Sequence, residues 1–225
     1  MITHLSKSTL DFTSDLEKNN NRDWFAINKP RYESARKEFT GFIAGVMKGM
    51  QAFEPEIAHQ EPKDTLFRIY RDVRFSNDKR PYKDHICAYL CADGRKSVKP
   101  GYYLHIKAGN QSFLAGGAWF PPSPELKALR QEIDYNYDEL ESLLRAPGFL
   151  KYFNGLEGER LKTTPKGYSA DHKAIEHLRR KSFNFSHKLT DKQVLSPDFL
   201  EHTLNVIAAM KPMNDFLMRG YEAGA

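Results

Sequence analysis

The chain has 225 residues, of which 40% are apolar and 28% are charged, and its formal net charge is +5 at pH 7. This composition is typical of a globular protein and excludes an intrinsically disordered chain. No run approaches about 18 apolar residues, which excludes a membrane-spanning helix, and the two cysteines are too few for a disulfide framework. Because the first ten residues carry no signal-peptide pattern either, we expect a cytoplasmic protein.

Helical periodicity dominates the first fifty residues. An apolar pattern from Thr9 to Leu16 predicts one helix, and Asp23 is the expected N-cap of a helix that begins at Trp24. Pro30 is expected to split this region, since proline is poorly tolerated inside a helix. Apolar residues at spacings of three and four then predict a helix over residues 31–50.

The middle of the chain changes to a period of two. Phe67, Ile69, Val73 and Phe75 would share one face of a strand, interrupted by Arg71. Further strands are predicted over residues 85–90, 102–107 and 111–120. The turn sequences between them predict an antiparallel meander. Two glycines inside the last of these strands, residues 116–117, suggest a bulge or a close backbone approach.

The last hundred residues return mainly to helices. Helices are predicted from residue 124 and over residues 138–144, and Asp171 is the expected cap of a helix over 172–181. A strand over 183–189 and a closing helix capped by Ser196 follow. We therefore expect one α+β domain over residues 1–225, with a central antiparallel sheet flanked by N-terminal, middle and C-terminal helices.

Two segments concentrate the positive charge. The segment Arg68 to Lys83 holds six Lys or Arg residues against two Asp, and Arg160 to Lys181 holds seven against one Asp and one Glu. Both also carry aromatic residues. We interpret Arg68 to Lys83 and Leu161 to Phe183 as halves of one site for an anionic partner.

The first segment combines two kinds of ligand-binding side chain. A guanidinium group presents a planar fork of donors that suits phosphate or carboxylate, and an aromatic ring can stack on a planar ligand. The predicted ligand-binding residues are Arg68, Tyr70, Arg71, Arg74, Lys79, Tyr82, Lys83 and Lys166. If the pocket is catalytic, Asp72 and His105 are candidate proton carriers.

Two alternatives to this assignment stay open. A shift of the strand register by one residue would exchange Arg68 and Arg74 for Arg71 at the pocket. The same residues also fit an ion-pair network, in which Asp72 pairs with its arginine neighbours and Arg71 pairs with a buried carboxylate.

Metal and cofactor motifs are not found. His85, Cys87, Cys91 and His105 match no common zinc-finger or zinc-ribbon spacing, so we predict no metal site. The sequence has no phosphate-binding glycine loop and no dinucleotide fingerprint, so it identifies no cofactor.

The run Arg-Ile-Tyr-Arg-Asp-Val-Arg-Phe-Ser-Asn-Asp-Lys-Arg-Pro-Tyr-Lys, residues 68–83, resembles the signature of a bacterial family called domain of unknown function 2461. The opening Phe12 to Phe25, the stretches 101–106 and 116–119, and residues 161–172 are also similar to that family. One departure is Lys173, where the family pattern has proline. The resemblance implies a single α+β domain and carries no established activity, substrate or catalytic residue.

Three functions fit these observations. The leading prediction is a pocket that binds a small molecule bearing phosphate or carboxylate, with turnover of that molecule left open. The alternative is a nucleic-acid-binding module that uses a basic, aromatic sheet face, although a net charge of +5 is modest for such a domain. A third is a scaffold whose basic strand docks on an acidic protein surface.

Overall fold

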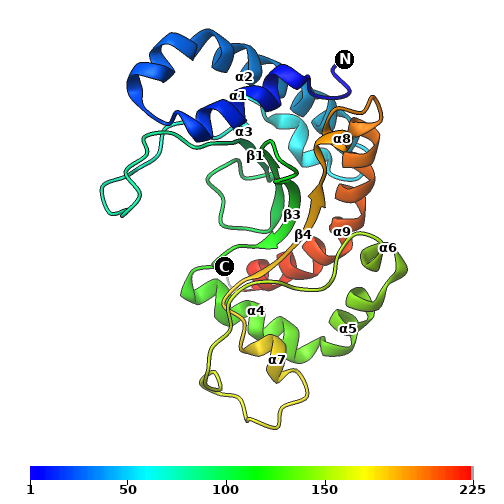
Figure 1. The fold of residues 1–225 in the computed structure, drawn as a ribbon. Coiled ribbons are helices and arrows are strands. Elements are labelled where there is room, and N and C mark those ends of the chain that lie inside the picture. The colour runs from blue at the N-terminus through cyan, green and yellow to red at the C-terminus, as the bar shows by residue number, and fades with distance from the viewer. Residues whose placement is uncertain (224–225) are drawn as a thin grey trace. The chain divides into compact units, whose positions relative to one another are not determined.

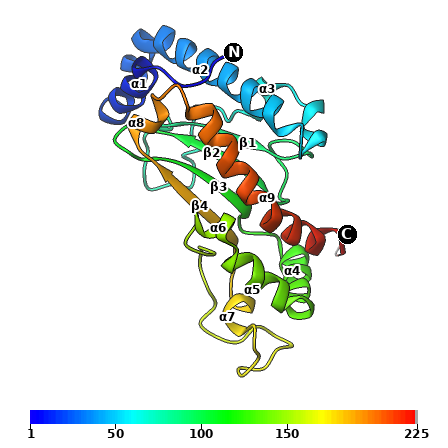
Figure 2. The same cartoon turned by 90° about the vertical axis from the view of Figure 1, so that its right-hand side faces the viewer.

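The computed structural model describes residues 1–223 and confirms an α+β fold with a four-stranded antiparallel sheet in the order β1-β2-β3-β4 (Figures 1 and 2). The chain divides into two compact units, and β2, β3, β4 and α9 contribute residues to both. The expectation of one domain over the whole chain stays a prediction. No helix among residues 1–223 is long and apolar enough to cross a membrane.

The first unit comprises Met1–Arg95, Tyr103–Leu114 and Lys188–Asn205. Its elements are α1 (Lys7–Lys18), α2 (Arg22–Met50), the 3₁₀ helix η1 (Pro55–His59), α3 (Pro62–Thr65), β1 (Ile86–Leu90), α8 (Asp191–Val194) and parts of β2 (Gly101–Ile106), β3 (Ser112–Ala118), β4 (Phe183–Leu189) and α9 (Phe199–Ala223).

Helix packing in this unit follows the predicted apolar stripe. The buried side chains of α2 include Phe39, Phe42, Ile43 and Val46, all fully buried. Helices α1 and α2 lie side by side (Figures 1 and 2). Burying such side chains contributes about 1.5–3 kcal/mol each relative to leaving them in water.

Helix α2 is longer than the sequence predicts, because it continues through Pro30. Its N-cap is Asn21 rather than Asp23, and the Asn21 side chain accepts a hydrogen bond from the backbone N–H of Trp24. Pro30 and Ala26, whose carbonyl lacks its helical donor, are both exposed. Water can therefore satisfy that carbonyl, which explains why the proline does not end the helix.

The predicted strand over residues 67–75 is wrong. Within it Tyr70 forms an isolated antiparallel bridge to Tyr82, and Leu66, directly before it, forms another to Ala88. Ile69 is buried as expected, but Phe75 is 97% exposed, so the apolar face ends at Ile69. Beyond it the chain forms a loop that projects from the unit (Figure 1).

The second unit comprises Lys96–Tyr102, Ala115–His187 and the chain from Val206 onward. It holds the remaining parts of β2, β3, β4 and α9, together with α4 (Ser123–Tyr135), α5 (Tyr137–Arg145), α6 (Pro147–Leu150) and α7 (Ile175–Leu178). Phe149, Phe153 and Phe185 form an aromatic group in its core, with ring centroids 4.9–5.2 Å apart.

Two expectations on this unit have opposite outcomes. The predicted helix over residues 172–181 is wrong, because only α7 forms, and Asp171 bonds to Ser169 instead of capping it. The close backbone approach at Gly117 is confirmed. Its φ is +98°, and a Cβ there would lie 2.0 Å from the Phe183 carbonyl oxygen.

Candidate functional site

A short antiparallel ribbon beside β1 carries the first basic segment. The backbone N–H of Phe67 donates to the Cys87 carbonyl at 3.0 Å, and that of Lys83 donates to the Ile69 carbonyl at 2.8 Å. This pairing brings Arg68, Lys83 and His85 to one place although they are up to seventeen positions apart in the sequence.

Tyr82 anchors this ribbon to the helices. Its ring stacks on Phe25 with centroids 4.0 Å apart, and Asn20 bonds to both its backbone N–H and its carbonyl, each at 3.0 Å. Tyr82 is therefore buried in the core. Tyr70, its bridge partner, remains 53% exposed.

Ion pairs close the projecting loop. Arg74 pairs with Asp72 at 2.6 Å, while Arg71 and Arg80 both pair with Asp78, at 2.7 and 2.8 Å. Lys79 donates to the Val73 carbonyl at 3.1 Å. The ion-pair interpretation is thus confirmed for Arg74 and Asp72. Arg71 does pair with a carboxylate, but that of Asp78 is partly exposed and not buried as predicted, and Arg68 forms no ion pair with Asp72.

The same ion pairs lower the pKa values of the two aspartates in the loop. Hydrogen bonds from the Arg74 side chain and backbone lower the pKa of Asp72 to about 2. Hydrogen bonds from Arg80, with a smaller contribution from Arg71, lower the pKa of Asp78 in the same way. A carboxylate so firmly held in its ionised form is a weak general base at neutral pH, which reduces the case for Asp72 as a proton carrier.

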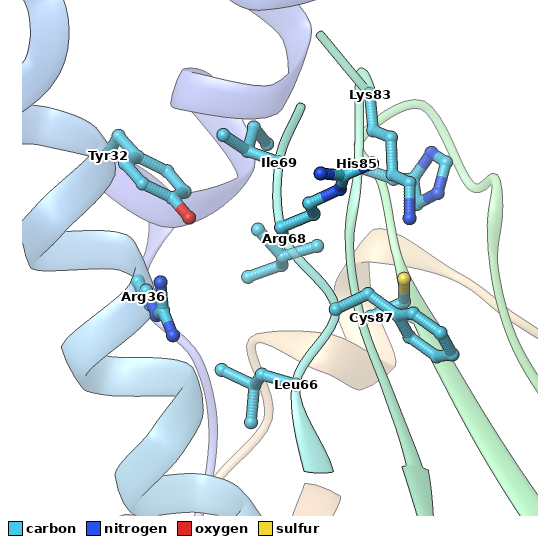
Figure 3. A pocket seen from close by; sticks show the side chains of 10 residues that line it. Tyr32, Arg36, Leu66, Arg68, Ile69, Lys83, His85 and Cys87 are labelled. Carbon is cyan, nitrogen blue, oxygen red and sulfur yellow. The ribbon is translucent and has the colours of Figure 1, made fainter. Parts of the chain in front are cut away.

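A pocket opens between α2 and this ribbon (Figure 3). Tyr32 and Arg36 face it from α2, while Arg68, Lys83 and His85 line it from the other side. The remaining lining residues are Leu66, Phe67, Ile69, Ile86 and Cys87.

The three cations of the pocket differ from the cations of the loop. No carboxylate among residues 1–223 lies within ion-pair distance of Arg36, Arg68 or Lys83. The ammonium group of Lys83 lies 4.8 Å from the ring centroid of Phe67. These side chains are therefore available to an anion, whereas Arg71, Arg74 and Arg80 are already paired with carboxylates.

A stacked pair of histidines, His85 and His105, lies at the pocket. The rings of His85 and His105 stack with centroids 4.0 Å apart, and His105 stacks on Phe113 at 4.5 Å. Burial lowers the pKa of His85, and burial together with repulsion from a protonated His85 lowers the pKa of His105 to about 3. Both imidazoles are therefore neutral at pH 7.

Asp84 connects this histidine pair to a lysine. Its carboxylate accepts from Nδ1 of His85 at 3.1 Å and from Nζ of Lys107 at 3.0 Å. Burial alone would raise the pKa of Asp84, but these two hydrogen bonds outweigh burial and lower it. Asp84 therefore stays ionised and orients the His85 ring.

The second basic segment lies in the other unit. Arg160 pairs with Glu176 at 2.8 Å, Lys181 pairs with Glu159 at 3.0 Å, and Lys166 is exposed. Arg180 is 4% exposed, donates to the Glu157 carbonyl, and has its pKa lowered to about 10 by burial and by Arg160. A single site built from both basic segments stays a prediction.

Tyr32 and Arg36 line the pocket but were not predicted from the sequence as site residues. Their spacing of four residues places both on one face of α2. That spacing identifies the pair, but only the packing of α2 beside the ribbon shows that the pair faces Arg68. Among residues 1–223, no group of three His, Cys, Asp or Glu side chains is arranged to hold a metal ion.

Comparison with known proteins gives one match. A family model described as conserved hypothetical protein (DUF2461) matches residues 8–216. No curated protein and no solved structure matches the chain.

Proposed function

This chain belongs to the DUF2461 family of conserved hypothetical proteins, and we propose that it binds a phosphate-bearing small molecule at the pocket lined by Arg36, Arg68 and Lys83. The family description names no activity, so the proposal depends on the pocket itself.

The observation that carries the proposal is the difference between two groups of cations in one segment. Arg71, Arg74 and Arg80 meet carboxylates within 2.8 Å, whereas Arg68 and Lys83 meet none and line the same pocket. Like charges held close together repel each other, and this repulsion is relieved when an anion binds between them.

Charge balance favours phosphate over carboxylate. A phosphate monoester carries about −1.5 to −2 charges at pH 7, which matches Arg68 and Lys83 together, while a carboxylate carries one. Arginine also binds phosphate oxygens in a bidentate manner. Tyr32 and Phe67 in the pocket wall offer apolar surface to the organic part of such a ligand.

The test is a titration of inorganic phosphate, pyrophosphate, nucleoside monophosphates and citrate, followed by calorimetry and by thermal unfolding. At a hundred times its dissociation constant, a ligand raises the free energy of unfolding by about 2.7 kcal/mol. Arg68→Gln should abolish this gain. Arg74→Gln is the matched control, because it removes an arginine that is already paired with Asp72, and it should bind phosphate as the parent does.

The proposal is wrong if no phosphate compound binds, or if Arg68→Gln and Arg74→Gln bind phosphate equally well. If citrate stabilises the protein more than every phosphate compound does, the pocket still binds anions, but its ligands are carboxylates.

Exposed aromatic residues favour nucleic acid as a second candidate ligand. Tyr70 is 53% exposed, Phe75 is 97% exposed, and the guanidinium of Arg74 lies 5.8 Å from the Phe75 ring. Bases of a single strand stack on such rings. A short single-stranded oligonucleotide should then bind with about 0.7 log units of affinity lost per contacted phosphate for each tenfold rise in salt, and Phe75→Ala should weaken it.

A further inference from the structure

Several histidines of the chain pair with a carboxylate through one ring nitrogen. They differ in what the other ring nitrogen contacts. Nε2 of His172 bonds to Asp134 at 2.9 Å, and its Nδ1 accepts the backbone N–H of Ala174 at 3.1 Å. His177 bonds to Glu141 through Nε2, and its Nδ1 is buried without a partner. Neither histidine offers a ring nitrogen to a ligand.

His85 is arranged differently. Its Nδ1 bonds to Asp84, and its Nε2 makes no hydrogen bond within residues 1–223. Because the ionised Asp84 can only accept, Nδ1 carries the ring proton and the lone pair is on Nε2. The His85 side chain is 21% exposed and lines the pocket beside Arg68 and Lys83 (Figure 3).

We propose that His85 is the general base of a hydrolytic reaction in which water attacks a phosphate ester held beside Arg68 and Lys83. This inference rests on the proposed function, because the same two cations would hold the ester. An aspartate–histidine pair with one open nitrogen next to cations combines the proton acceptor and the charge stabilisation that this reaction needs.

The step balances without another reactant. As the oxygen of water forms its bond to phosphorus, one of its protons passes to Nε2 of His85. The bond between phosphorus and the ester oxygen breaks with its electron pair staying on that oxygen. The leaving group takes a proton from solvent if it needs one, and His85 releases its proton to solvent.

The groups around His85 keep it in the basic form. Lys83 faces it from the ribbon, the stacked His105 faces it from β2, and Lys107 faces it from directly after β2. Arg68 shares its pocket, and Asp84 is the one carboxylate bonded to it. Burial lowers the pKa of His85 below its usual 6.5 despite Asp84. Activity should therefore persist to a lower pH than an ordinary histidine base would allow.

The experiment measures hydrolysis of p-nitrophenyl phosphate and bis(p-nitrophenyl) phosphate by the full chain. His85→Gln should lower kcat by about 10²- to 10⁴-fold, which is the usual contribution of a general base, while inorganic phosphate still binds. His172→Gln is the matched control, since it removes a histidine paired with aspartate in the other unit, and it should keep the parent activity.

A second measurement needs no turnover. Diethyl pyrocarbonate modifies neutral imidazole nitrogens, so mass spectrometry should find His85 modified and His172 unmodified. Inorganic phosphate should slow the modification of His85 in the parent but not in Arg68→Gln.

The possible outcomes separate this inference from the proposed function. If phosphate binds through Arg68 but the parent hydrolyses no faster than His85→Gln, or if phosphate does not protect His85, the general-base assignment is wrong and the binding function stands. If phosphate neither binds nor protects, both proposals are wrong.

Discussion

Asn20 lies outside the basic segment, yet its side chain fixes the position of that segment. Its amide accepts from the backbone N–H of Tyr82 and donates to the Tyr82 carbonyl. This pair of bonds replaces the partner that a neighbouring strand would supply. Because Lys83 follows Tyr82 directly, Asn20 helps to hold a pocket cation in place.

Asn20→Ala should lower the free energy of unfolding by about 1–3 kcal/mol, because it leaves two backbone groups of the buried Tyr82 without partners. Urea denaturation measures this change. Asn28→Ala is the control and should cost much less, because the Asn28 amide donates to the Trp24 carbonyl and accepts from the Arg31 side chain, and its loss leaves no buried backbone group without a partner. Equal losses for both variants would show that Asn20 has no special role.

The arginines show what the sequence could and could not predict about the site. The spacing of basic residues along the sequence identified Arg68, Arg71 and Arg74 as one basic cluster. Which of them are neutralised depends on how the loop turns, and the loop brings Asp72 back onto Arg74 and Asp78 onto Arg71. Arg36 was not predictable, because its place at the pocket depends on packing between segments far apart in the sequence.

Among the elements, strong and continuous periodicity was a reliable guide. The strand predicted over residues 183–189 forms with those bounds, because its alternating apolar residues bury one face. The segment 67–75 has a similar alternation and forms no strand, since its polar residues pair within the loop. A local pattern does not reveal that competition.

At Gly117 the backbone of β3 approaches that of β4 closely, and Gly117→Ala should destabilise the protein by about 3 kcal/mol or more. An added Cβ would meet the Phe183 carbonyl oxygen at 2.0 Å, so a backbone must shift. The free energy of unfolding in urea measures the effect.

Gly94 supplies the comparison for this substitution. Its φ is +85°, similar to that of Gly117, but a Cβ there would meet nothing within 4 Å. Gly94→Ala should therefore cost only about 1 kcal/mol, the penalty of the left-handed backbone alone. If the two variants lose equal stability, the close approach at Gly117 does not contribute.

Across the whole molecule, burial holds several histidines in their neutral form. It lowers the pKa of His85 and His105 in the first unit and of His177 in the second. Below about pH 6.5 these histidines therefore bind protons in the unfolded chain more readily than in the folded protein. Mild acid should destabilise the protein before most carboxylates are protonated.

His105 should contribute most to this acid sensitivity. Its pKa is about 3 in the folded state against 6.5 for the ordinary side chain. Its stabilising contribution is complete above pH 6.5 and is lost as the pH falls toward 3, at up to about 1.4 kcal/mol per pH unit. Urea denaturation across this range should show a smaller slope for His105→Gln than for the parent, and an unchanged slope would contradict the assignment.

The bridge between Tyr70 and Tyr82 divides the ribbon into two parts with separate constraints. Arg68 and Lys83 lie on the core side of the bridge. Phe75 lies on the outer side, as do the arginines that pair with carboxylates in the loop. Residues 72–79 can therefore change in length or sequence while both cations keep their positions. A peptide tag inserted into the projecting loop should therefore leave phosphate binding at the pocket unchanged.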